Sequence, residues 1–172
     1  MGLREGWSVG PDRPSLPERQ LQITSWADLG AGEESGSTVV ADLRTMLFED
    51  GPQAGDAYMR LENPVVAQGN LFEVAPAVAS VIVAAITDGS IPEKNVALVL
   101  DLLGRIVGGA ADPSEVAAGR GDLAERCQAE ALLGYWSIVK LAAIQDAYGA
   151  HDMAANVLEV LDTDHSSRLL NF

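Results

Sequence analysis

The chain of 172 residues is long enough for one domain, which would bury roughly two-thirds of the surface that the unfolded chain exposes. Hydrophobic residues make up 48% of it and aromatic residues only 5%, so we expect a core of Ala, Val, Leu and Ile, which favours closely packed helices. The net charge of −14 makes nucleic acid and anionic membranes poor partners, because both are polyanions. A basic or neutral protein partner fits this charge better.

The first twenty residues mix charges, Gly and Pro and have no apolar centre, which is not the pattern of a secretion signal. The longest apolar run, residues 74–86, is shorter than the ~18 residues that suggest a membrane span, and Pro76 and Ser80 interrupt it. We therefore expect a cytoplasmic protein without a membrane segment. The expected organisation is a flexible N-terminal arm over 1–22, one helical domain over 23–162 and a C-terminal tail over 163–172.

The N-terminal half predicts three short helical elements. One helical turn covers 25–29, with Ser25 as its cap and Trp26 inward, and residues 30–36 form a loop. The next helix runs from Ser37 or Thr38 to about Phe48. A third helix covers 53–62 and ends before Pro64, because the residue before proline avoids the helical region. The inward side chains expected of the helix ending at Phe48 are Val39, Leu43, Met46 and Leu47.

A helix hairpin over residues 70–108 is the clearest structural signal in the chain. Residues 71–86 are apolar on nearly every face, and from 96 to 107 apolar residues recur at helical spacing. Gly89 is expected to cap the first helix, and Ser90 with Glu93 predicts a capping box for the second. Pro76 indicates a short turn over 70–75 before the main helix, or a kink within one helix. The connection is short, so the helices are antiparallel neighbours.

The segment 68–78, Gln-Gly-Asn-Leu-Phe-Glu-Val-Ala-Pro-Ala-Val, resembles a segment of small bacterial HEAT-like repeat proteins. In that family, a Gln-Gly pair leads to an aromatic residue and an Ala-Pro-Ala helix start, and a second helix packs back on the first. The resemblance covers residues 64–108, and 122–161 matches it in pattern. It implies an all-α fold of antiparallel helix hairpins, stacked as a HEAT-like repeat or as an irregular helical bundle, that holds another protein. It carries no site residues over to this chain.

Further helix signals follow in the C-terminal half. Asp112 begins a short helix to about Ala118, and Asp122 with Glu125 forms a capping box for a helix that extends to Tyr148. Gly134 either splits this long helix or lets a neighbouring helix approach closely. The last helix begins at Asp152. The inner stripe expected of the long helix is Leu123, Cys127, Ala131, Gly134, Ile138, Leu141 and Gln145, widened by Leu133, Trp136 and Val139.

Candidate chemical groups are few. The single Cys127 excludes an intramolecular disulfide and is interpreted as an inert buried thiol. Glu130 is expected at a helix edge, paired with Arg126 one turn earlier. His151 with the following Asp resembles a fragment of a metal-dependent phosphohydrolase pattern, but His165 is the only other histidine. We therefore predict no catalytic, cofactor-binding or metal-binding residues and no cofactor.

The acidic residues are unevenly distributed. Nine carboxylates lie between residues 28 and 73, against only Arg44 and Arg60. They are Asp28, Glu33, Glu34, Asp42, Glu49, Asp50, Asp56, Glu62 and Glu73. One interpretation is that they only keep the protein soluble, and the other is an acidic face that steers a basic partner. Glu33, Glu34, Glu49 and Asp50 are interpreted as solvated loop acids. In the interpretation of an acidic face, the candidate partner-binding residues are Glu49, Asp50 and Asp56.

These patterns favour a non-catalytic protein–protein interaction module, with an immunity protein or an adaptor as the concrete hypothesis. The alternative is a small-ligand-binding or catalytic helical domain with a pocket between helix hairpins. A concave acidic groove would favour the first hypothesis. An apolar cavity with convergent polar side chains would favour the second.

Overall fold

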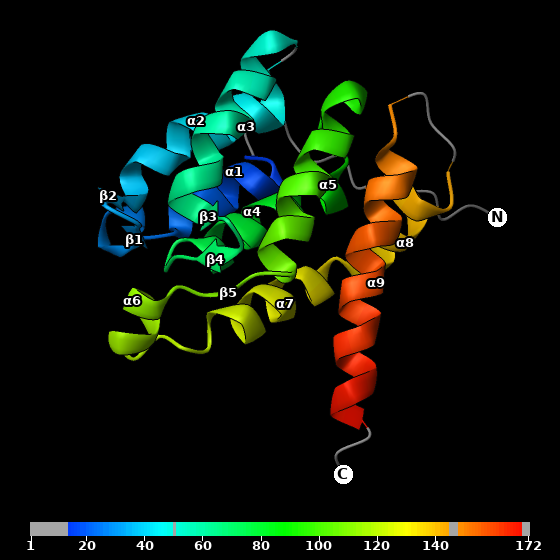
Figure 1. Ribbon diagram of the computed structural model, residues 1–172. Helices are drawn as coiled ribbons and strands as arrows, with labels where there is room; N and C mark the ends of the chain where they lie inside the picture. Colours follow the sequence, from blue (N-terminus) through cyan, green and yellow to red (C-terminus); the bar gives the residue numbers. More distant parts are fainter. Residues whose placement is uncertain (1–13, 50, 145–147, 170–172) are drawn as a thin grey trace, which may run out of the picture.

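The computed structural model describes residues 14–49, 51–144 and 148–169, with side chains described up to Thr163. The described chain is mostly helical, as predicted, with a few very short strands (Figure 1). The helices are α1 (Leu16–Ile23), η1 (Trp26–Asp28, a 3-10 turn), α2 (Gly36–Phe48), α3 (Pro52–Val65), α4 (Ala75–Asp88), α5 (Glu93–Val107), α6 (Pro113–Ala117), α7 (Leu123–Leu133), α8 (Tyr135–Ala142) and α9 (Ala150–Leu169). The strands are β1 (Gly30–Ala31), β2 (Glu34–Ser35), β3 (Val66–Ala67), β4 (Asn70–Leu71) and β5 (Ala110–Ala111). No helix in the described residues is both long and apolar enough to cross a membrane.

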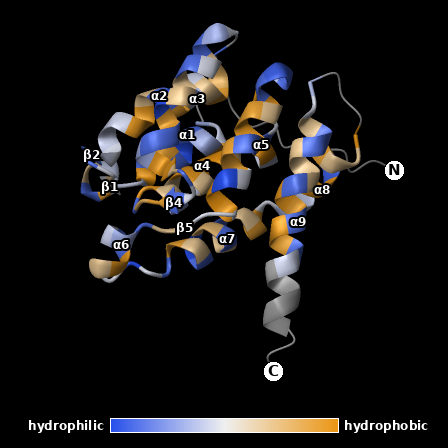
Figure 2. Cartoon of the chain, viewed as in Figure 1, coloured by the Kyte–Doolittle hydropathy of each residue, from blue (hydrophilic) through white to orange (hydrophobic). Residues whose placement is uncertain are grey.

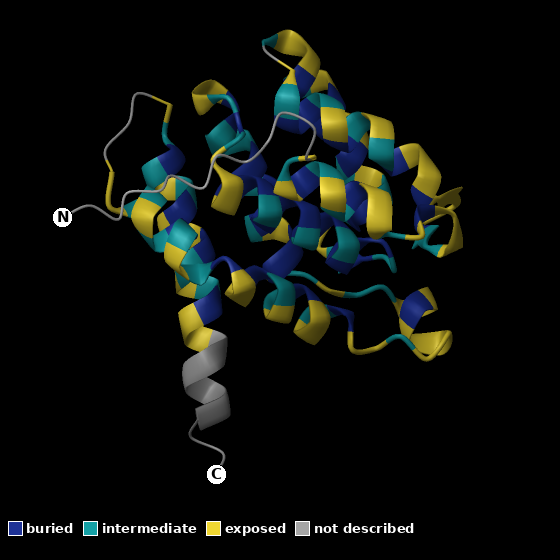
Figure 3. Cartoon of the chain, turned by 180° about the vertical axis from the view of Figure 1, so that it is seen from behind, coloured by how far each residue is buried: buried dark blue, intermediate teal, exposed yellow. Residues whose placement is uncertain are grey.

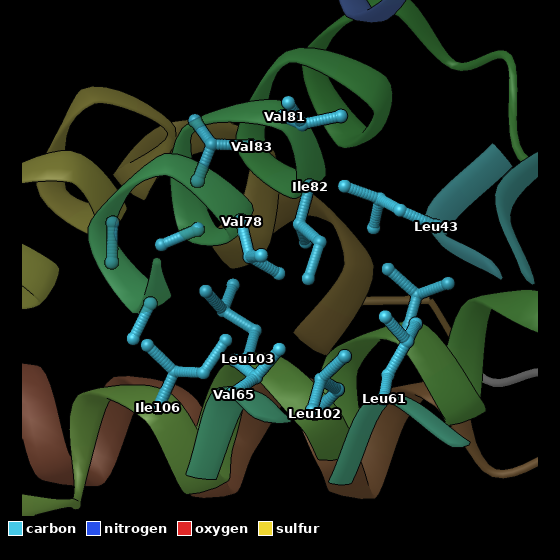
Figure 4. Close-up of a cluster of buried hydrophobic side chains, with 14 of the residues drawn as sticks. Leu43, Leu61, Val65, Val78, Val81, Ile82, Val83, Leu102, Leu103 and Ile106 are labelled. Atoms are coloured by element: carbon cyan, nitrogen blue, oxygen red, sulfur yellow. The ribbon is translucent and has the colours of Figure 1, made fainter. Parts of the chain in front are cut away.

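Helix α4 lies at the centre of the core and contacts α1, α5 and α7. Its nearly uniform apolar sequence matches this position, because a helix surrounded by neighbours has no wet face (Figure 2). Figure 4 shows side chains of α4 facing those of α5, with Leu43 of α2 and Leu61 of α3 beside them. Ile82, Val83, Leu100 and Leu103 are all buried in this core.

The hairpin of α4 and α5 is confirmed, but the start of α5 differs from the prediction. Gly89 adopts the left-handed conformation (φ 67°) and its N–H donates to the Ala85 carbonyl, as expected of a C-terminal cap. The capping box is wrong: α5 begins after Pro92, and the buried Ser90 hydroxyl has no hydrogen-bond partner in the described structure. Ile91 precedes proline and therefore favours an extended backbone, which delays the helix.

A buried amide joins α5 to α2. Asn95 Nδ2 donates to the Met46 carbonyl (3.2 Å) and to the Glu49 carbonyl (2.6 Å). These are carbonyls that the end of α2 leaves without partners inside the helix. The predicted inward side chains of α2 are all buried. These two hydrogen bonds offset the free-energy cost of burying the Asn95 amide and fix the end of α2.

Helix α3 continues through Pro64, so the prediction that it ends before this proline is wrong. The next residues explain the difference, since Val65 is fully buried and its carbonyl accepts the Phe72 N–H (3.3 Å). Tertiary contacts therefore outweigh the local preference of the residue before proline. The chain then forms antiparallel β3–β4, and β5 joins β4 in parallel through the pair Asn70–Ala110.

Two N-terminal regions are more ordered than the sequence indicates. Part of the expected arm forms α1, which packs on α4 and buries Leu21, and residues 1–13 lie outside the described residues. Trp26 is buried as predicted, and its Nε1 donates to the Leu21 carbonyl (2.9 Å). The loop expected over 30–36 contains the β1–β2 hairpin, in which Gly30 pairs with Ser35.

Both roles considered for Gly134 are observed. Helix α7 ends before it and α8 begins after it, and a Cβ on Gly134 would lie 2.7 Å from Val83 Cγ1. Leu133 is 78% and Trp136 77% exposed, so their assignment to the core is wrong. Figure 3 shows the alternation of buried and exposed faces from behind. The predicted inner stripe itself is confirmed, since Leu123, Cys127, Ala131, Gly134 and Ile138 are buried, and Trp136 lies on the side away from them.

The other predicted helix starts are partly correct. Asp112 caps α6 by accepting the Ser114 N–H (2.8 Å), whereas the Asp122 side chain makes no such bond although α7 begins beside it. Helix α9 begins at Ala150, two residues before Asp152, and extends to Leu169 into the region expected to be a tail. Residues 145–147, which include the predicted core position Gln145, lie outside the described residues.

Candidate functional site

An open groove of about 550 Å³ lies where the β1–β2 hairpin meets the end of α3, the segment after β4 and the start of α6. These elements gather on one side of the molecule, seen at the left in Figure 1. The residues that line it come from five separate parts of the sequence: Ala31, Gly32, Glu33, Glu34, Asn63, Pro64, Ala67, Phe72 and Ser114. We name it the acidic groove.

Backbone contacts hold the β1–β2 hairpin beside the start of α4. The Val74 N–H donates to the Gly30 carbonyl (2.9 Å), and the Gly30 N–H donates to Glu73 Oε2 (3.0 Å). Glu73 also faces Arg120, with Oε1 and Nε 3.9 Å apart. Arg120 in turn pairs with the buried Glu115 of α6. This chain of contacts fixes one wall of the groove.

The Phe72 ring lies against the turn of the hairpin. A Cβ built on Gly32 would lie 3.7 Å from ring atoms of Phe72, and Gly32 has a φ of +63° that suits glycine. Phe72 is half-buried and lines the groove. The groove is therefore lined both by an aromatic ring and by the polar residues of the β1–β2 hairpin.

The carboxylates of Glu33 and Glu34 give the groove its charge. Both residues are exposed, and Glu34 Oε2 accepts a hydrogen bond from Thr38 Oγ1 (2.8 Å). None of the described residues that line the groove is Lys, Arg or His, and neither glutamate forms an ion pair with a described cation. In the part of the chain that the structure describes, this negative charge therefore has no counter-ion.

The acids predicted to form a partner-binding face lie elsewhere. Glu49 caps the end of α2 and Asp56 lies in α3; both are exposed, neither lines the acidic groove, and Asp50 lies outside the described residues. Other acids of the same stretch are engaged in ion pairs, such as Asp42 with Arg60 (2.7 Å). Glu33 and Glu34, which the sequence indicates as solvated loop acids, are exposed and also line the groove. The feature of the sequence that indicates this position is Gly32, which permits a tight hairpin.

The remaining chemical candidates have simple environments. Cys127 is buried, and burial raises the pKa of its thiol to about 12, which matches the inert thiol that was predicted. The predicted Arg126–Glu130 ion pair is not formed in the described structure, and both side chains instead line a shallow pocket beside α1. Within the described residues, no group of three or more His, Cys, Asp or Glu side chains is arranged to hold a metal ion.

Comparison of the chain with protein-family models, curated protein sequences and solved structures found no match.

Proposed function

We propose that this protein is a non-catalytic protein–protein interaction module whose acidic groove receives a Lys or Arg side chain of a basic or neutral partner. The observation that carries this proposal is that the Phe72 ring lines the same groove as two carboxylates, neither of which pairs with a cation among the described residues. An aromatic ring attracts a cation within about 6 Å of its centre, by roughly 0.5–1 kcal/mol at an exposed site. Glu33 and Glu34 add charge-assisted hydrogen bonds to the same cation.

Two further features support a protein partner. Leu133 and Trp136 remain exposed on α7 and α8, and large exposed apolar side chains are typical of protein interaction surfaces. The resemblance of residues 64–108 to HEAT-like repeat proteins favours the same role. We propose a cytoplasmic immunity protein or adaptor, which binds a partner and thereby neutralises or recruits it.

The test uses a short peptide with one Arg, acetyl-Gly-Gly-Arg-Gly-Gly-amide, titrated into the ¹⁵N-labelled protein. The matched peptide carries citrulline, which keeps the shape of Arg and removes its charge. The groove variant is Glu33→Gln with Glu34→Gln. The control variant is Glu49→Gln with Asp56→Asn, which changes the net charge equally at acids outside the groove.

We expect chemical-shift changes around Phe72 with the Arg peptide and much smaller changes with citrulline. The groove variant should bind the Arg peptide about ten-fold more weakly, a loss of ~1.4 kcal/mol, while the control variant binds nearly as the wild type does. Equal weakening in the two variants would show that net charge alone attracts the peptide, and the proposed role of the groove would be rejected.

A further inference from the structure

A second groove lies between α5 and α9, about 380 Å³ in volume, with the β3–β4 hairpin at one end. We name it the α5–α9 groove. Its apolar lining comes from Val66, Leu100, Met153 and Val160, and it also contains three glycines whose missing side chains leave space. A volume of this size is within the range of small-molecule sites, which are mostly apolar with a few oriented polar groups.

The polar groups are Asp101 and Arg105, one turn apart on α5, and Asn156 on α9. Side chains of α3 form hydrogen bonds with Asp101 and Arg105. Asp101 Oδ2 accepts hydrogen bonds from the Tyr58 hydroxyl and from Arg105 Nε (3.0 Å). Arg105 Nη1 donates to Glu62 Oε1 (2.5 Å), and its guanidinium lies 5.9 Å from the centre of the Tyr58 ring.

These contacts leave one acceptor atom on Asp101 and one donor atom on Arg105, on residues one helical turn apart. Within the described part of the chain, no hydrogen bond uses Asp101 Oδ1 or Arg105 Nη2. The two side chains are 38% and 49% exposed, so water and a solute can reach them. Since Tyr58 and Glu62 already fix both charged side chains, ligand binding would cost little conformational entropy at Asp101 and Arg105.

We propose that the α5–α9 groove binds a free α-amino acid with an apolar side chain. The ammonium group donates to Asp101 Oδ1, and the carboxylate accepts from Arg105 Nη2, so that each charge of the zwitterion meets its opposite. The apolar side chain lies against Leu100 and Met153. This site is separate from the acidic groove and does not depend on the proposed protein partner.

The experiment compares three probes by ¹⁵N NMR titration of the full chain. L-Leucine carries both charges, L-leucinamide lacks the carboxylate, and 4-methylpentanoate lacks the ammonium group. L-Leucine should produce saturable shifts confined to α5, α9 and β3–β4, and each analogue should bind at least about ten-fold more weakly. Similar binding of all three probes, or no shifts with L-leucine up to about 20 mM, a weak-binding limit, would overturn the proposal.

A pair of variants locates the site. Asn156→Trp places a ring over the groove from an exposed position on α9, whereas Ala155→Trp places the same ring on a neighbouring exposed residue that does not line the groove. Both positions are outside the core, and circular dichroism checks that both variants fold. Loss of L-leucine binding only in Asn156→Trp supports the site. Retained binding in Asn156→Trp, or equal loss in both variants, refutes it.

Discussion

Replacement of Gly134 by Ala tests the packing of the α7–α8 junction against the central helix. The new Cβ would lie 2.7 Å from Val83 Cγ1, whereas ordinary contacts begin at 3.4 Å, so one side must move by a large part of an ångström. Val83 is a β-branched residue within α4, and such side chains have one strongly preferred rotamer in a helix. It is also 94% buried, being only 6% exposed, so it cannot turn away freely.

Overpacking of this kind costs about 1–3 kcal/mol, and the loss of a glycine offsets some of that by restricting the unfolded chain. We therefore expect Gly134→Ala to lower the free energy of unfolding by about 1–2 kcal/mol in urea denaturation. Gly55→Ala is the matched control, because Gly55 lies within α3 and has no atom within 4 Å of an added Cβ. It should stabilise the protein by ~0.5–1 kcal/mol.

A double-mutant cycle assigns the cost to one contact. Val83→Ala alone should destabilise the protein, but in combination with Gly134→Ala it removes the methyl group that the new Cβ meets. The double variant should therefore be more stable than the sum of the single effects by about 1 kcal/mol. If Gly134→Ala is as stabilising as Gly55→Ala, or if the two effects at the junction simply add, the close contact of α7–α8 with α4 is refuted.

Other expected outcomes concern the core, pH dependence and thiol reactivity. Leu103→Ala should lower the free energy of unfolding by ~2–5 kcal/mol through lost burial and a cavity. Trp136→Ser should stay within about 0.5 kcal/mol of the wild type, because Trp136 is exposed. Similar losses for the two variants in urea denaturation would contradict the burial of Leu103 and the exposure of Trp136. Burial, then the Asp101 carboxylate, raises the pKa of the Tyr58 hydroxyl above its ordinary 10.0, so the native state retains a proton that the unfolded chain releases. Stability from this group is complete below about pH 10 and is lost as the pH rises further, and Tyr58→Phe should flatten that loss in unfolding measured across alkaline pH. With a thiol pKa of about 12, Cys127 in the native protein at pH 8 should react with Ellman's reagent ~1,000-fold more slowly than in urea, and equal rates would show that it is not buried.

The parts of the fold that could be predicted are those fixed by local sequence. The α4–α5 hairpin follows from a continuous apolar helix, Gly89 as its cap and a periodic second helix, all within one stretch of chain. The Asp112 cap is equally local. These features can be predicted without the tertiary contacts, because the residues that form them are neighbours in sequence.

The errors arise where distant residues decide the outcome. Pro64 stays in α3 because Val65 is buried and bonded to Phe72, and the two-residue strands exist only because the segments that pair are brought together by the helices. Trp136 lies on the side of α8 away from the buried Ile138, and its hydrophobicity alone could not show that no described element covers this side. The two grooves could not be predicted from the sequence either, because their lining residues come from several elements.

The central claim is that a protein partner docks at the acidic groove, and site-specific photo-crosslinking in the native cell tests it most directly. A benzophenone amino acid replaces Glu33 at the groove or, as the control, the exposed Asp56 outside it. We predict a discrete crosslinked species from position 33 whose partner is basic or neutral, with its yield reduced by Phe72→Ala, and no such species from position 56. A crosslink from position 56 alone, or a position-33 crosslink to a strongly acidic protein, would contradict the account.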